Sequence, residues 1–182
     1  MNCITSKSKD LINIVKCHKS VFPDALSSKL GPLFILKMYE WYITSDRGIL
    51  FHIENEDNEI IGYCGGIITK HKGQHGAVTS ISQYSFNTFV ISYLIRPWLL
   101  FHPEMLKKIS SIKKNILLKL DLNKQIEKIN KEDFIPFMGL VVIGLTKDNQ
   151  GKGIGSTLLN EFEKRAKNNI DIKKISLSVK PE

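Results

Sequence analysis

The stretch KDNQGKGIGSTLL, from Lys147 to Leu159, decides how this chain is interpreted. It places Gly151, Gly153 and Gly155 around a lysine at the start of a helical pattern. Glycine loses more conformational freedom on folding than any other residue, so three of them cost stability. The first N–H groups of a helix have no partner inside the helix, and the helix dipole adds partial positive charge there. The stretch therefore predicts that a phosphate group approaches this backbone closely.

The flanking sequence predicts one βαβ unit. The continuous apolar run Phe137–Leu145 is typical of a central strand covered on both faces. A helix is expected from about Gly153 to Asn168, because its apolar residues fall four apart and share one face. The alternating run Lys174–Val179 follows as a second strand.

Three phosphate-binding motifs compete for the glycines. A P-loop would need a glycine at Thr146 and a serine or threonine at Gly153, so it does not fit. The dinucleotide motif G-x-G-x-x-G matches only in part, because Ser156 stands where the third glycine would be. The motif Gln/Arg-x-x-Gly-x-Gly/Ala matches Gln150, Gly153 and Gly155 at every fixed position.

Upstream, the pattern predicts two helices followed by a hairpin. The helices span about residues 8–20 and Pro32–Ile43. The hairpin pairs Ile49–Glu54 with Glu59–Ile68 around the turn Asn55–Asn58.

Residues 69–135 interrupt this order and are predicted to form a helical insertion. The apolar run Phe86–Phe101 is too short for a membrane span, and it is expected to be a buried helix that ends before Pro97. A basic amphipathic helix is expected from Glu104 to Leu120. It is interpreted either as a contact for a membrane surface or a large anionic acceptor, or as a solvated face packed on the core.

In this setting the motif at Gln150 resembles that of the GCN5-related N-acetyltransferase (GNAT) superfamily. The resemblance covers roughly residues 1–68 and 136–182. It implies an α/β (α+β) fold, in which helices flank a mixed sheet and a helical insertion separates the third and fourth strands. The whole chain, 1–182, is expected to form one acyl-CoA N-acyltransferase domain.

The resemblance implies acetyl-CoA as a co-substrate and no metal. Backbone amides of the loop would hold the pyrophosphate, the end of the preceding strand would pair with the pantetheine arm, and Gly144 would mark a bulge there. The cofactor-binding residues implied are Ile143, Gly144, Leu145, Gln150, Gly151, Lys152, Gly153, Ile154, Gly155 and Ser156. The competing interpretation is a plain glycine turn that links strand to helix.

The implied reaction is attack of an amine on the thioester, with an oxyanion stabilised by backbone N–H groups near Val142–Leu145. Many members of the superfamily carry a glutamate on the strand before the loop, and this chain has none there. His52 and Glu54, on one strand face, are the candidate bases, and Tyr63 and Tyr84 are weaker candidates.

The superfamily usually continues beyond a strand such as Lys174–Val179 with a tyrosine that is often the general acid. The fold is therefore expected to have a truncated C-terminus, with this strand at an exposed edge. Either a homodimer that covers the edge or a chain cut from a longer protein is expected.

Composition narrows the remaining choices. The net charge of +8 suits an anionic partner or simply a basic surface. Cys3, Cys17 and Cys64 are scattered, which favours reduced thiols and a cytoplasmic protein. The leading interpretation is an N-acetyltransferase for a primary amine, such as an amino sugar or a carrier-linked sugar. The alternatives are a non-catalytic acyl-CoA-binding or regulatory module, and a peripheral binder of membranes or lipid-linked substrates; no nucleic-acid partner is expected.

Overall fold

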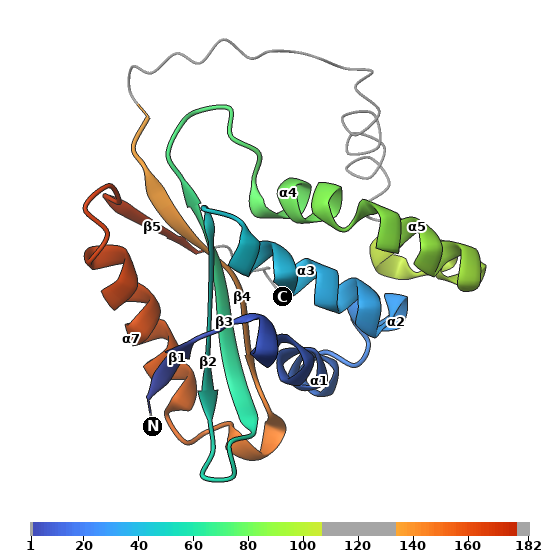
Figure 1. Cartoon of the computed structure of the whole chain (residues 1–182), viewed down its shortest axis with the longest axis horizontal. Helices are drawn as coiled ribbons and strands as arrows, with labels where there is room; N and C mark the ends of the chain where they lie inside the picture. The colour runs from blue at the N-terminus through green and yellow to red at the C-terminus, as the bar shows by residue number, and fades with distance from the viewer. Residues whose placement is uncertain (1, 107–133, 178–182) are drawn as a thin grey trace.

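The computed structural model describes residues 2–106 and 134–177, which form a five-stranded sheet with helices on both faces (Figure 1). The strands lie in the order of the chain: β1 (Cys3–Thr5), β2 (Gly48–Glu54), β3 (Ile60–Thr69), β4 (Phe137–Leu145) and β5 (Lys174–Leu177). The first four strands are antiparallel to their neighbours, and β5 runs parallel to β4. This confirms the mixed α/β fold expected from the sequence. Among the described residues β5 lies at the sheet edge, as predicted.

Among the described residues, α1 (Leu11–Val21) and α3 (Pro32–Thr44) pack on one face of the sheet with three further helices beside them, and a single long helix covers the other face (Figure 1). The single helix is α7 (Ile154–Lys167), which follows the glycine loop. The three further helices are α2 (Leu26–Leu30), α4 (Ala77–Tyr84) and α5 (Phe86–Ile95). Short 3-10 turns complete the described elements: η1 (Ser8–Asp10), η2 (Pro97–Phe101) and η3 (Lys147–Asn149).

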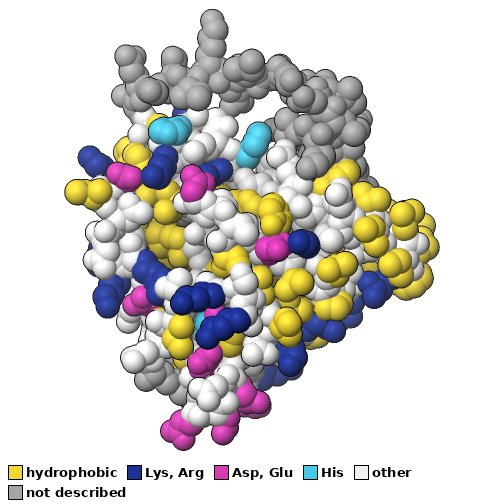
Figure 2. Space-filling model, viewed as in Figure 1, with side chains coloured by type: hydrophobic (Ala, Val, Ile, Leu, Met, Phe, Trp, Pro, Cys, Tyr) yellow, Lys and Arg dark blue, Asp and Glu magenta, His cyan; other side chains and the backbone are white. Residues whose placement is uncertain are grey.

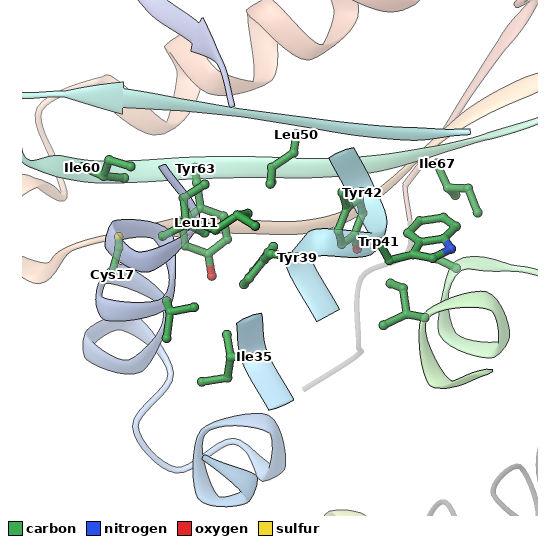
Figure 3. Close-up of a cluster of buried hydrophobic side chains, with 14 residues drawn as sticks. Leu11, Cys17, Ile35, Tyr39, Trp41, Tyr42, Leu50, Ile60, Tyr63 and Ile67 are labelled. Carbon is green, nitrogen blue, oxygen red and sulfur yellow. The ribbon is translucent and has the colours of Figure 1, made fainter. Parts of the chain in front are cut away.

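The sheet separates two hydrophobic layers. On the α1 and α3 side, Tyr39, Tyr42 and Tyr63 pack together with Cys17 (Figure 3). On the α7 side, the apolar stripe of that helix packs against the sheet. Its members are Ile154, Leu158, Phe162 and Ala166, which meet Phe51, Ile53, Cys64 and Met138. The residues that the sequence predicted to share one face of this helix, four positions apart, are thus its buried residues.

Local sequence explains the hairpin and the start of α3. Asn55 accepts hydrogen bonds on its side-chain oxygen from the amides of Asp57 and Glu59, and Asn58 takes a positive φ of 60°. Pro32 is the first residue of α3, where its missing N–H costs nothing. The hairpin and the predicted helices at 8–20 and Pro32–Ile43 are confirmed within a few residues, while β1, α2 and α4 were not predicted.

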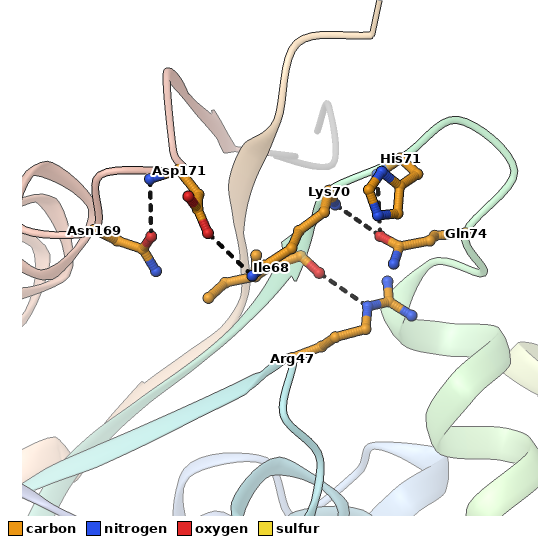
Figure 4. A network of polar contacts seen from close by, with 7 residues as sticks. All are labelled: Arg47, Ile68, Lys70, His71, Gln74, Asn169 and Asp171. Atoms are coloured by element: carbon orange, nitrogen blue, oxygen red, sulfur yellow. Dashed lines mark hydrogen bonds and ion pairs between the residues drawn. The ribbon is translucent and has the colours of Figure 1, made fainter. Parts of the chain in front are cut away.

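A polar network fixes the segment that leaves β3 for α4 (Figure 4). The guanidinium of Arg47 donates to the carbonyl oxygens of Ile68 and His75 at 3.0 and 2.9 Å. On the other side, the ammonium of Lys70 lies 3.1 Å from the carboxylate of Asp171, in the turn before β5. The network therefore ties the segment after β3 to the residue before β2 and to the turn before β5.

The apolar run Phe86–Phe101 forms α5 and η2, and α5 ends before Pro97 as expected. The prediction that this helix is buried is wrong, because Ser92 is its one buried residue and Leu94 is 77% exposed. One face of α5 packs Phe89 and Tyr93 against Phe34 of α3. Its remaining apolar side chains gather on the surface that Figure 2 shows. The apolar residues are spread around the helix, so the sequence could not reveal which face the neighbouring helices would cover.

No helix in residues 2–106 and 134–177 is long and apolar enough to cross a membrane. The basic helix predicted from Glu104 to Leu120 falls almost entirely outside the described residues. The homodimer stays a prediction.

Candidate active site

A β-bulge in β4 creates the first element of the site. Leu140 pairs with Gly66 and Val142 pairs with Gly65, so Val141 has no partner on β3. A bulge turns two consecutive side chains toward one side of the strand. Here Val141 and Val142 both line one pocket on the α3 side of the sheet.

The bulge was expected at Gly144, and that prediction is wrong. Gly144 pairs regularly with Tyr63. Glycine is needed at this position for packing, because a Cβ there would lie 2.7 Å from Cε1 of the Tyr63 ring. The bulge itself lies three residues earlier, inside a uniform apolar run that carries no sequence signal for it.

The described pairing of β4 with β5 runs from Phe137 and Lys174 to Leu140 and Leu177, the last described residue of β5. Within the described residues, no strand pairs with Val141–Leu145 on the side away from β3. An extended ligand can add to a strand edge by backbone hydrogen bonds.

The glycine loop begins where β4 ends. The side-chain amide of Gln150 donates to the carbonyl oxygen of Leu145 at 3.1 Å and folds the loop back onto the strand. Gly151 and Gly153 have φ values of +74° and +77°, which side chains rarely adopt. Gly153 is also the N-cap of α7.

The loop glycines face open space among the described residues. A Cβ added at Gly151, Gly153 or Gly155 would meet nothing within 4 Å. Within the described part of the chain, the amides from Gly151 to Ser156 donate no hydrogen bond, and no side chain caps α7. The loop therefore combines free donors, the positive end of a helix dipole and room for a ligand, which together suit an anion.

A pocket of about 620 Å³ lies beside the bulge, between the helices and the sheet. Its volume is in the range typical of small-molecule sites. Most of its walls are apolar, and its polar members include His18, Ser27, Ser82 and Glu104. The apolar side chains are Leu26, Leu30, Phe34, Met38, Val78, Ile81, Phe86, Phe89, Val141 and Val142.

His18 connects this pocket to the interior. Its Nδ1 lies 2.8 Å from the hydroxyl oxygens of both Tyr39 and Tyr63, and its Nε2 lies 2.9 Å from Oγ of Ser27. Burial lowers the pKa of His18 from 6.5 to about 4, because the charged imidazolium loses its water. His18 is thus neutral near pH 7 and acts there as a hydrogen-bonding group.

The sequence-predicted catalytic residues do not converge on this pocket. His52 is buried with Nδ1 2.8 Å from Oγ of Ser6 and Nε2 3.3 Å from Glu54, one strand further from β4. Tyr63 is fully buried and reaches the pocket only through His18. Tyr84 is 43% exposed at the end of α4 and does not line the pocket.

His18 was missed by the sequence reasoning, although a signal existed. In α1 it follows Leu11 and Ile14 at spacings of seven and four residues, so it lies on the buried stripe of the helix. A titratable residue on such a stripe needs internal partners. Glu104 and the bulge carried no comparable signal.

No group of three histidine, cysteine, aspartate or glutamate residues in 2–106 and 134–177 is arranged to hold a metal ion.

No family model matches the sequence, and a comparison with curated protein sequences finds no match. Solved structures with a similar fold exist. The aminoglycoside N-acetyltransferase AAC(6')-Iy in complex with CoA is 11% identical with a TM-score of 0.57, over 99% of this chain and 77% of that one. A GNAT family acetyltransferase from Staphylococcus aureus is 15% identical with a TM-score of 0.54, over 100% and 89%. A transcriptional regulator from Bacillus halodurans is 14% identical with a TM-score of 0.54, over 98% and 81%.

At these identities the likeness defines the fold: the chain has the fold of the GNAT acetyltransferases.

Proposed function

We propose that the protein is an acetyl-CoA-dependent N-acetyltransferase that acts on a primary amine in the cytoplasm. One observation carries the proposal. Among the described residues, a bulged strand whose end has no partner on the side away from β3 meets an open, amide-lined glycine loop, and a small-molecule pocket lies at its side. The fold's acetyltransferase neighbours, one of them in complex with CoA, support the same reading.

The donor would occupy the edge of β4 and the loop. Amides from Gly151 to Ser156 would receive the pyrophosphate, with Lys152 adding positive charge. The pantetheine arm would pair with Ile143–Leu145, the strand end that no described strand covers. This arrangement would bring the thioester toward the bulge, where Val141 and Val142 face the pocket.

The amine would then attack the thioester carbonyl directly. Its nitrogen forms the new amide bond, the carbonyl oxygen bears transient negative charge that backbone N–H groups stabilise, and the thiolate leaves and takes up a proton. An amine must lose a proton before or during attack. With a pKa of about 4, His18 is a weak base, so we assign it to orienting the acceptor through Ser27 rather than to deprotonating it.

The direct test is calorimetric titration with CoA, followed by turnover of acetyl-CoA with a panel of primary amines. We expect CoA to bind at one site and free thiol to be released only when an amine is present. Absence of CoA binding to folded protein would refute the proposal.

A second function, an acyl-CoA-binding module without turnover, is favoured by two observations. No carboxylate lies on β4, and the fold also occurs in a protein described as a transcriptional regulator. CoA binding without thiol release for any amine in the panel would support this second function instead.

A further inference from the structure

The pocket beside the bulge has mostly apolar walls, with a cluster of polar groups at one end and the hydroxyls of Thr79 and Ser82 on α4. Phe34, Met38 and Phe89, from α3 and α5, line the apolar part, and Ile81 and Phe86 extend it along α4 and α5. The polar end lies at the first turn of α2. A ligand that fits this pocket therefore needs a polar group at one end and an apolar body along the rest.

Two hydrogen bonds place the polar groups of that end next to one another. A carboxylate oxygen of Glu104 accepts from the amide of Leu26 at 3.3 Å. The next residue, Ser27, lies 2.9 Å from Nε2 of His18 through its hydroxyl. Adjacent residues of one turn thus hold a carboxylate and a neutral imidazole at one end of the pocket, and Glu104 is the one acidic side chain among its described lining residues.

This lining is unsuited to a polyhydroxylated sugar. Each sugar hydroxyl that loses water without gaining a partner costs about 1 to 3 kcal/mol. Phe34, Phe89 and Ile81 offer no donor or acceptor to such hydroxyls, and the hydroxyls of Thr79 and Ser82 can pair with only a few of them. An alkyl or aromatic group on the same walls would instead gain about 25 cal/mol for each Å² of apolar surface removed from water.

We infer that the pocket binds a primary amine carried on an apolar alkyl or aralkyl body, with the ammonium at Glu104 and the body along α3 and α5. That this amine is the acetyl acceptor rests on the proposed function. Its binding to the pocket does not, because binding needs no acetyl-CoA. On the way to attack, the ammonium gives one proton to Glu104 or to water and becomes the free nucleophile.

The test is calorimetric titration of the protein alone with three small probes. The probes are 2-phenylethylamine, the uncharged 2-phenylethanol of nearly the same shape, and glucosamine as a polar amine. We expect 2-phenylethylamine to bind at least about tenfold tighter than either of the others, a difference of about 1.4 kcal/mol. Equal or tighter binding of glucosamine would overturn the inference.

Two variants locate the binding. Glu104→Gln keeps an oxygen that can accept from the Leu26 amide but removes the charge, so it should weaken 2-phenylethylamine about tenfold and leave 2-phenylethanol nearly unchanged. Ser82→Phe fills the pocket from α4 and should weaken both probes. Gln83→Phe, on the same helix but outside the pocket lining, is the matched control and should weaken neither. Unchanged binding in both Glu104→Gln and Ser82→Phe would overturn the assignment to this pocket.

These readouts separate the inference from the proposed function. If 2-phenylethylamine binds as expected but releases no thiol from acetyl-CoA, the pocket assignment stands and the catalytic proposal fails. If acetyl-CoA is turned over with glucosamine and not with 2-phenylethylamine, the catalytic proposal stands and the pocket assignment fails.

Discussion

The glycines of the sheet and the glycines of the loop after β4 have opposite surroundings. At Gly144, in β4, the Tyr63 ring occupies the place of a side chain, as Phe162 does at Gly66 in β3. At Gly151 and Gly153, in the loop, the same place is empty. The sheet glycines are therefore explained by the protein's own packing, whereas the loop glycines are explained by their backbone conformation and leave open space beside the chain.

The contrast extends to polar groups. Near Gly144, the buried hydroxyls of Tyr39 and Tyr63 both lie within hydrogen-bond distance of Nδ1 of His18, so these polar groups have partners inside the protein. Around Gly153, the amides of the loop have no partner in the described residues. Substitutions in the first region should change stability, and substitutions in the second should change ligand affinity.

Gly144→Val is expected to cause the largest loss of unfolding free energy. The new Cβ would lie 2.7 Å from the Tyr63 ring, which is fully buried and cannot move aside without disturbing His18. Forced overpacking of this kind costs about 3 kcal/mol of unfolding free energy. Urea denaturation measures it, and a loss below about 0.5 kcal/mol would contradict the close packing.

Acidification should destabilise the same region. The folded pKa of His18, about 4, lies below its ordinary 6.5, so the unfolded chain binds more protons between these pH values. The stability from neutral His18 is fully present above pH 6.5 and is lost as the pH falls toward 4. The loss should amount to about 2 to 3 kcal/mol.

The measurement is urea denaturation from pH 7 to pH 4, with His18→Gln as the control. The variant should show a shallower pH dependence of unfolding free energy, whatever its stability at pH 7. Parallel curves for the two proteins would show that His18 does not titrate as stated.

Gly153→Val addresses the loop. A branched side chain would enter the space that a phosphate needs and would strain a φ of +77° by about 1 to 2 kcal/mol. We expect CoA to bind at least about tenfold more weakly in calorimetric titration. Unchanged CoA affinity in a folded variant would remove the pyrophosphate from this loop.

Gly155→Ala is the matched control for Gly153→Val, and we expect it to have the smallest effect on stability and on CoA affinity. Gly155 lies in the first turn of α7 at a negative φ, so alanine should raise stability by about 0.5 kcal/mol. Alanine also satisfies the last position of the Gln/Arg-x-x-Gly-x-Gly/Ala motif, so CoA affinity should change by less than about threefold, or 0.7 kcal/mol. A large loss of affinity here would mean that the loop responds to any side chain, and Gly153→Val would then no longer identify a specific position.

The sequence predicted the features that depend on residues close along the chain. Gln150, Gly153 and Gly155 form a contiguous motif, and the stripe of α7 repeats every fourth residue, so the βαβ unit was readable from local pattern. The pocket was not, because His18, Glu104 and Val142 come together only when α1, the residues after η2 and β4 assemble. His52 and Glu54 share a strand face as predicted, yet strand order places them away from the bulge. Periodicity specifies a face but not which neighbour covers it.

The two buried cysteines, Cys17 and Cys64, can report when the structure around them opens locally. Cys17 lies in the layer under α1 and α3, and Cys64 lies in the layer under α7. Burial raises the pKa of their thiols to about 11 and about 12, so neither forms the reactive thiolate while its layer is closed. The labelling rate of each thiol therefore measures how often its own layer opens, and comparing the two rates shows whether the α3 side and the α7 side of the sheet open together or separately.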